Sequence, residues 1–310
     1  MARSLRDLRR KMKAIKSTRQ VTKAMELVAA SKMRRAVQNA QILRQYAILA
    51  WHILQRLSIN NAGMHPYLEQ RPAGRILCVV ISSDRGLCGS LNTQLFRATT
   101  QYVQSVRTLS TFQAMEFVAV GRKGQQFLTR TGQSVIAAFP ALSNHPTFKD
   151  ALPITRFITE SYLARKYDHV VLVYMDFISA LVQEPAVKPL LPFSTSTLRD
   201  MIANLLPASR RKDALPSDMG SGDDHRKYIF EPSTHEVLDA VLPQLTEVQV
   251  YQAILESAAS EHSARMVAMR NASDNASDIL GDLTLTYNQT RQANITGELA
   301  ELSAATAVMK

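Results

Sequence analysis

From Leu5 to Leu57 the chain contains neither glycine nor proline, and its apolar or small residues recur every three or four positions. This spacing places them along one face of an α-helix, and the residues between them are strong helix formers. A helix over this stretch is roughly 80 Å long at 1.5 Å per residue. Because such a helix buries little surface alone, it needs a second helix beside it. The expected contact face consists of Leu5, Leu8, Met12, Ile15, Thr18, Thr22, Met25 and Ala29.

The other end of the chain supplies that second helix. No proline follows Leu245, and a near-heptad series of apolar and small residues is sustained there over several heptads, which is the pattern of a coiled coil. Because the rest of the chain lies between the two helices in sequence, they can pair antiparallel. We therefore predict a long antiparallel coiled coil of the N- and C-terminal helices. The C-terminal contact face consists of Val248, Leu255, Ala259, His262, Met266, Met269, Ala276, Leu280, Leu283 and Tyr287.

The middle of the chain alternates strand and helix patterns. A continuous apolar run over 75–82 predicts a strand buried on both faces. The other expected strands are 116–120, 134–138 and 169–175, followed by an edge hairpin through 177–182 and 187–192. The expected helices are 91–105, 124–131 and 154–166, and a turn-rich linker is expected at 60–74. The fold class is therefore α/β, a coiled coil plus a Rossmann-like domain with a mainly parallel sheet.

These patterns divide the chain into three parts. We expect an N-terminal coiled-coil helix at 1–58, a Rossmann-like foot domain at 59–240 and a C-terminal coiled-coil helix at 241–310. Within the foot domain, the polar stretch 207–225 contains prolines and glycines and is expected to be a flexible surface loop.

Almost all of the net charge lies in the first 35 residues. They contain twelve lysines and arginines and two acidic residues, a net charge of +10, while the whole chain carries +11. A merely solvated helix face would mix charges of both signs, so this segment indicates an acidic partner. Nucleic acid could bind it through phosphates, and a protein could bind it through an acid-lined cavity. The charges cover many helix faces and no aromatic residue precedes Tyr46, which favours the protein.

No catalytic or cofactor-binding pattern stands out. The loop segment 86–89 fits neither the G-x-G-x-x-G nor the G-x-x-x-x-G-K-[ST] phosphate motif. Cys88 lies near Arg85, which could lower its pKa, but a small buried residue at a tight turn is the simpler interpretation. The seven histidines do not cluster, and no apolar run is long enough to span a membrane. We expect no catalytic residue, cofactor or metal, and a solvated helix face at Asp274, Asp278 and Asp282.

Four segments resemble signatures of the gamma subunit of F-type ATP synthases. Residues 23–33, KAMELVAASKM, are similar to the family's N-terminal helix, and residues 83–92, SDRGLCGSLN, to its loop after the first strand. Residues 260–275, SEHSARMVAMRNASDN, and 287–296, YNQTRQANIT, are similar to its C-terminal helix. The four segments occur in the family's order, and the resemblance covers nearly the whole chain.

This resemblance implies a central rotor stalk. In the family, the terminal helices form a coiled coil inside a ring of alpha and beta subunits, and the α/β foot lies against the epsilon subunit and the c-subunit ring. Ion flow turns the c ring, and the shaft drives the beta-subunit catalytic sites through their states. The resemblance thus implies a non-catalytic subunit for ATP synthesis and hydrogen ion transport, with no nucleic-acid partner and no direct membrane insertion.

The resemblance also implies contacts with partners. Met25 falls at the position facing the beta-subunit hinge region, and Arg291 and Gln292 match the pair that meets the beta-subunit catch loop. Tyr228 belongs to a segment similar to the one near epsilon and the c ring. For each residue, ordinary packing or solvation stays open as an alternative. Together with the basic segment, the expected contacts are Arg9, Arg10, Lys23, Met25, Tyr228, Arg291, Gln292, Thr296 and Glu298.

The chain departs from the family's pattern in places. Gly297 stands where the family usually has glutamine, which weakens the helix by up to about 1 kcal/mol relative to alanine. Residues 302–310 lack the usual Gly-Ala-rich ending, and a plant-type redox insert with paired cysteines is absent. The N-terminal periodicity runs on without a leader-cleavage pattern. We therefore expect a bacterial protein, peripheral on the cytoplasmic face of the inner (plasma) membrane.

Overall fold

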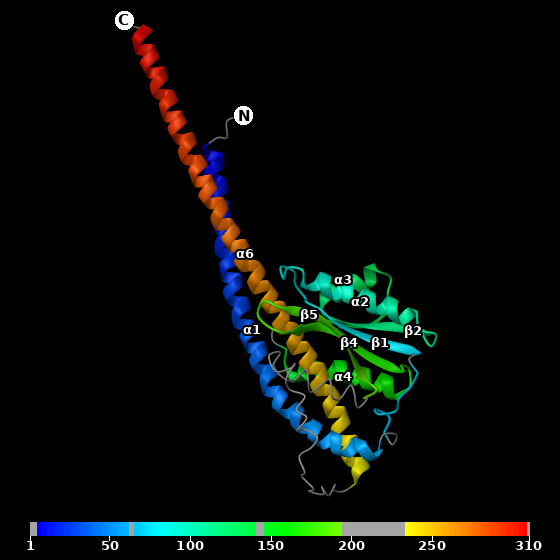
Figure 1. Ribbon diagram of the computed structural model, residues 1–310. Coiled ribbons are helices and arrows are strands. Elements are labelled where there is room, and N and C mark those ends of the chain that lie inside the picture. Colours follow the sequence, from blue (N-terminus) through cyan, green and yellow to red (C-terminus); the bar gives the residue numbers. More distant parts are fainter. Residues whose placement is uncertain (1–4, 62–64, 73, 141–145, 194–232, 309–310) are drawn as a thin grey trace. The chain divides into compact units, whose positions relative to one another are not determined.

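The computed structural model describes residues 5–61, 65–72, 74–140, 146–193 and 233–308 (Figure 1). It divides into two compact units. One comprises Met1–Ala29 with Arg265–Lys310, and the other comprises Ala30–Ala264. Two long helices, α1 (Leu5–Asn61) and α6 (Thr234–Val308), contribute to both units.

The second unit contains a five-stranded sheet with the strand order β3-β2-β1-β4-β5. The pairs β1–β2, β1–β4 and β2–β3 are parallel, and β4–β5 is antiparallel, which confirms a mainly parallel sheet. The predicted edge hairpin is wrong in its bounds, because the strand before it continues to Phe177 and itself forms the hairpin with β5. The strands are β1 (Arg75–Ile81), β2 (Ala114–Val120), β3 (Val135–Phe139), β4 (His169–Phe177) and β5 (Gln183–Leu191).

Helices cover both faces of this sheet (Figure 1). Helices α2 (Leu91–Arg107) and α3 (Arg122–Arg130) pack on one face, together with Cys78 and Val80 of β1. Helix α4 (Phe148–Leu163) and the first part of α6 pack on the other, together with Leu77, Val79 and Ile81. Successive β1 side chains therefore enter two different apolar cores, which explains the continuous apolar run in the sequence.

Several helix ends differ from the sequence-based expectation. Helix α4 begins at Phe148 instead of residue 154, and α6 begins at Thr234 instead of residue 241. Both helices contain an internal proline, Pro153 and Pro243. Helix α1 ends at Asn61, so the first two residues of the predicted linker are helical.

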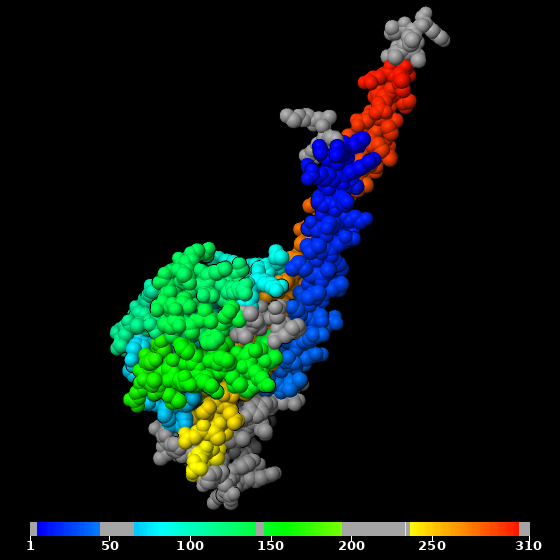
Figure 2. All heavy atoms as spheres, turned by 180° about the vertical axis from the view of Figure 1, so that it is seen from behind, coloured from blue at the N-terminus to red at the C-terminus, as the bar shows by residue number. Residues whose placement is uncertain are grey.

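The first unit is an antiparallel pair formed by the N-terminal part of α1 and the C-terminal part of α6 (Figures 1 and 2). Leu8 and Ala29 of α1 are buried, as are Met269 and Ala276 of α6. The predicted contact positions from Met266 to Tyr287 are all buried or half-buried. Thr18 is the exception on α1: it is exposed, and its hydroxyl donates to the carbonyl of Ala14 in its own helix.

Candidate functional site

The basic segment of α1 faces solvent along much of its length. Arg9, Arg10 and Lys23 are exposed. Lys23 Nζ lies 2.9 Å from Glu26 Oε2, one turn further along the helix. Because the Lys23 side chain is 57% exposed, such a pair contributes little to stability. The segment therefore presents positive charge on its surface.

Arg9 also connects the two helices of the first unit. Its Nε and Nη2 atoms donate hydrogen bonds of 2.8 and 2.5 Å to the phenol oxygen of Tyr287. The antiparallel register thus places residue 9 beside residue 287. One of the arginines predicted to contact a partner therefore has an intramolecular role as well, and its contact with a partner stays a prediction.

Met25 lies on the packed side of α1. It is half-buried, between the buried Thr22 and Ala29. On other sides of the same helix, Val21, Leu27 and Val28 are each more than half exposed. These three exposed residues were not predicted. They could have been found as apolar residues that lie outside the expected contact series.

The C-terminal stretch of α6, residues 291–303, is exposed at every position. Figures 1 and 2 show this end of α6 continuing past the described start of α1. Arg291, Gln292, Thr296 and Glu298 all lie here with their side chains in solvent. The predicted contact residues of the C-terminal helix are therefore accessible.

An apolar stripe runs along the same stretch. Ile295, Leu299 and Leu302 are 49%, 59% and 64% exposed. At 100° per residue, the spacing of four and then three positions puts them on one helix face, with Arg291 and Glu298 on that face too. This stripe was not predicted, although its i, i+4, i+7 spacing is visible in the sequence. Large apolar side chains on an otherwise solvated helix end indicate a surface that a partner covers.

Tyr228 and the loop 207–225 lie outside the described residues. Their predicted roles stay predictions.

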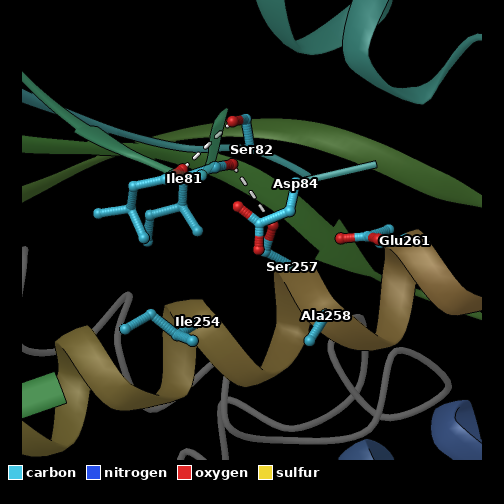
Figure 3. Close-up of a pocket in the computed structure, with 9 residues that line it drawn as sticks. Ile81, Ser82, Asp84, Ile254, Ser257, Ala258 and Glu261 are labelled. Carbon is cyan, nitrogen blue, oxygen red and sulfur yellow. Dashed lines mark hydrogen bonds between the residues drawn. The ribbon is translucent and has the colours of Figure 1, made fainter. Parts of the chain in front are cut away.

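The carboxyl ends of β1 and β2 meet α6 at a small pocket (Figure 3). Ser82 and Asp84 follow β1, whereas Ser257 and Glu261 belong to α6. Ser257 Oγ donates a 3.4 Å hydrogen bond to the carbonyl of Ile81, which ties the helix to the strand end. The space enclosed is about that of one water molecule, far smaller than a nucleotide.

The loop after β1 caps the N-terminus of α3. The backbone N–H of Arg122 donates to Asp84 Oδ1 at 3.1 Å, and that of Gly124 donates to Ser82 Oγ at 2.7 Å. The N–H of Lys123 donates to the carbonyl of Ser83 at 3.1 Å. A phosphate at a helix N-terminus needs such N–H groups. Here the chain's own oxygen atoms occupy them, which supports a structural role for this loop.

Cys88 is a packed residue of the same loop. It is 2% exposed, and Asn92 Nδ2 lies 3.4 Å from its sulfur and donates a 2.7 Å hydrogen bond to Ser83 Oγ. Burial also raises the pKa of Cys78 on β1 to about 12. These surroundings favour the packing interpretation of both cysteines over a nucleophile.

Within the described residues, no group of three or more His, Cys, Asp or Glu side chains has an arrangement suited to a metal ion. Asp274, Asp278 and Asp282 are exposed along α6, as a solvated face requires. In the same part of the chain, no helix has a stretch long and apolar enough for a membrane span.

The described geometry is that of a partner-binding protein. Its helical pair has a basic surface and an exposed apolar end, and in its α/β domain the loop after β1 serves as a helix cap. The family model described as ATP synthase matches residues 4–308. The chain is 40% identical over 309 residues to the ATP synthase gamma chain of Roseiflexus sp. (strain RS-1), covering 99% of this chain and 98% of the relative. It therefore belongs to the ATP synthase gamma-chain family.

Other relatives and solved structures agree. The gamma chain of Herpetosiphon aurantiacus is 39% identical over 310 residues, with 97% of each chain covered. The central stalk and c-ring structure of the Tetrahymena thermophila mitochondrial ATP synthase matches with a TM-score of 0.57 and 26% identity, over 82% of this chain and 99% of that one. A Euglena gracilis mitochondrial ATP synthase structure shares the fold, with a TM-score of 0.63 and 21% identity over 98% of this chain and 94% of that one.

Family membership confirms two predictions made from the sequence. The resemblance to gamma subunits is correct, and the chain is a non-catalytic stalk subunit of a larger enzyme. It is a peripheral component of that enzyme.

Proposed function

We propose that this chain couples rotation of a c-subunit ring, driven by ion flow, to conformational cycling of the beta-subunit catalytic sites of an F-type ATP synthase. The observation that carries the proposal is the 40% identity to a gamma chain over 99% of this chain. The match to the Tetrahymena central stalk and c-ring structure supports the same role. Its partners are the alpha and beta subunits, the epsilon subunit and the c ring.

The contact surfaces follow from exposure and charge. The basic segment of α1 meets acidic groups of the alpha and beta subunits through Arg10 and Lys23. The C-terminal stretch enters the ring with its apolar stripe, and Arg291 contacts a beta subunit beside that stripe. We place the assembly on the cytoplasmic face of a bacterial inner membrane. The division at 1–58, 59–240 and 241–310 separates shaft from foot in this proposal.

Replacing Met25 with lysine tests the coupling role. Met25 is half-buried at the point where the family's shaft faces the beta-subunit hinge region. A lysine there adds a charge to a packed surface, and we expect ATP-driven proton pumping in vesicles to fall about tenfold while ATP hydrolysis continues. The matched control is Met25→Gln, which has similar length without the charge and should retain most pumping. Unchanged coupling in the lysine variant would count against this contact.

The basic segment predicts a salt-dependent assembly. Exposed charges are screened over about 10 Å at 0.1 M salt. We expect the affinity of the chain for the alpha-beta ring to fall about tenfold between roughly 0.05 M and 0.5 M salt. An Arg10→Gln/Lys23→Gln variant should show a shallower dependence in the same titration. Equal affinities of the unmodified chain at both salt concentrations would show that charge attraction does not contribute to binding of the ring.

A further inference from the structure

A buried polar cluster lies between α6 and the β4–β5 hairpin. Tyr174 and Asp176 belong to β4, Lys188 to β5, and Gln252 and Glu256 to α6. Asp176 is 6% exposed and Glu256 is 8% exposed. All five belong to the second compact unit, so their mutual positions are defined. Two carboxyl groups are therefore buried in one cluster.

Glu256 is only half satisfied by hydrogen bonds. Its Oε1 accepts a 2.9 Å bond from Gln252 Nε2. Its Oε2 is buried and has no hydrogen-bond partner within 3.5 Å, and the Tyr174 hydroxyl, which lowers the pKa of Glu256, is the further donor close to this carboxyl. Burying an ionised carboxylate oxygen without a hydrogen-bond donor costs free energy. A protonated carboxyl group carries no charge and avoids most of that cost. The geometry of this side chain therefore favours the acid form.

The negative charge of Asp176 acts in the same direction, and the positive charge of Lys188 opposes it. Lys188 Nζ lies 3.8 Å from Asp176 Oδ2 and donates a 2.7 Å hydrogen bond to the hydroxyl of Tyr174. The ammonium group is thus engaged with β4. Burial raises the pKa of Glu256 most, and the negative charge of Asp176 raises it further, while Lys188, Gln252 and Tyr174 oppose the rise. Asp176, Lys188 and Tyr174 are the titratable groups that act on Glu256 within the described residues.

We propose that this cluster is a proton-binding site, in which Glu256 is a neutral carboxylic acid at neutral pH and links the docking of α6 on the sheet to pH. The proton sits on the carboxyl group and removes the second negative charge beside Asp176. Its loss at alkaline pH places an unpaired charge at the helix–sheet contact and destabilises it. The inference concerns this chain alone and does not depend on the rotor proposal.

The sign of the pH dependence follows from the raised pKa. A carboxyl group that binds its proton more tightly in the folded chain stabilises the fold fully below its unfolded pKa, near 4.5. That stabilisation is lost as the pH rises through the folded pKa. Glu256→Gln keeps the shape of the protonated acid but cannot titrate. The unmodified chain should therefore lose stability relative to the glutamine variant as the pH rises.

Urea unfolding of the full-length chain tests this. Between pH values of about 5 and 9, we expect the ratio of the two unfolding constants to change by about tenfold per pH unit until the folded pKa is reached. Glu160→Gln, which changes an exposed glutamate on α4, should follow the unmodified chain. Parallel curves for Glu256→Gln and the unmodified chain would overturn the proposal, as would a change in the opposite direction.

A second measurement needs no variant that might fail to fold. Infrared spectra of the unmodified chain, with its glutamates isotope-labelled, should contain the carbonyl band of a protonated glutamic acid at neutral pH. The absence of that band would overturn the proposal. In Asp176→Asn, the band should disappear at a lower pH, by about one unit or more, because the like charge is removed.

Discussion

Replacing Gly121 with alanine should lower the free energy of unfolding of the chain by about 3 kcal/mol or more. Gly121 precedes α3 with a φ of +94°, a conformation that disfavours any side chain. A Cβ atom there would lie 2.2 Å from the carbonyl oxygen of Ser82 and 2.8 Å from its Oγ. Because Ser82 directly follows β1 and its Oγ caps α3, it cannot move aside without breaking the cap. Urea unfolding of the full-length variant measures the loss.

Gly132 provides the matched control. It also has a positive φ, +69°, but a Cβ atom there would have no neighbour within 4 Å. Gly132→Ala should therefore cost only the backbone strain, about 1 kcal/mol. If both variants lost the same stability, the close approach of Ser82 to Gly121 would not be the cause. The comparison separates steric contact from backbone conformation.

Apolar periodicity was enough to predict the helical pair and most strands. The run over β1 indicated burial on both faces, and its residues do alternate between two helix-covered cores. The strand order β3-β2-β1-β4-β5 was beyond prediction, because the same local patterns are compatible with several orders of parallel strands. The hairpin was misplaced because the exposed Leu181 and Val182 have the composition of a strand.

Prolines caused the errors at two helix starts. Pro153 lies inside α4 and suggested that the helix begins after it. However, Thr147 and Asp150 form a capping box ahead of it, in which the Thr147 N–H donates to Asp150 Oδ2 at 2.9 Å. The hydrogen bond from the Thr147 hydroxyl, and after it the one from the Thr147 N–H, lowers the pKa of Asp150. The T-x-x-D pattern was visible in the sequence. The stabilisation from this cap and from burial of one helix face exceeds the loss of the backbone hydrogen bond that proline cannot donate.

The buried polar groups of α6 could not be predicted from the sequence. The segment around Glu256 and Ser260 has a surface-like composition, yet both residues are buried. Ser260 Oγ donates to the carbonyl of Met175, at a distant position in the sequence. Such acceptors become visible only after the sheet and the helix are placed together. Sequence periodicity therefore predicts which helix face is packed, but not which polar atoms find hydrogen-bond partners on that face.

Replacing the apolar stripe with glutamate should greatly weaken assembly with the alpha-beta ring without unfolding the chain. Ile295, Leu299 and Leu302 are each about half exposed or more, so Ile295→Glu/Leu299→Glu/Leu302→Glu should change the free energy of unfolding by less than about 0.5 kcal/mol. In the proposed assembly the same side chains are buried by the ring. Covering three large apolar side chains contributes about 4 kcal/mol or more, so the affinity should fall roughly a thousandfold.

The matched control changes exposed leucines elsewhere. Leu109 follows α2 and Leu163 ends α4, and both are about half exposed. Leu109→Glu/Leu163→Glu adds charge to the foot domain and should leave the affinity for the alpha-beta ring within about twofold, since these residues lie outside the proposed contact surface. Titration of each labelled variant with the purified ring measures both affinities. A stripe variant that binds as tightly as the unmodified chain would show that the ring does not cover the end of α6, even if the chain acts as a stalk by other contacts.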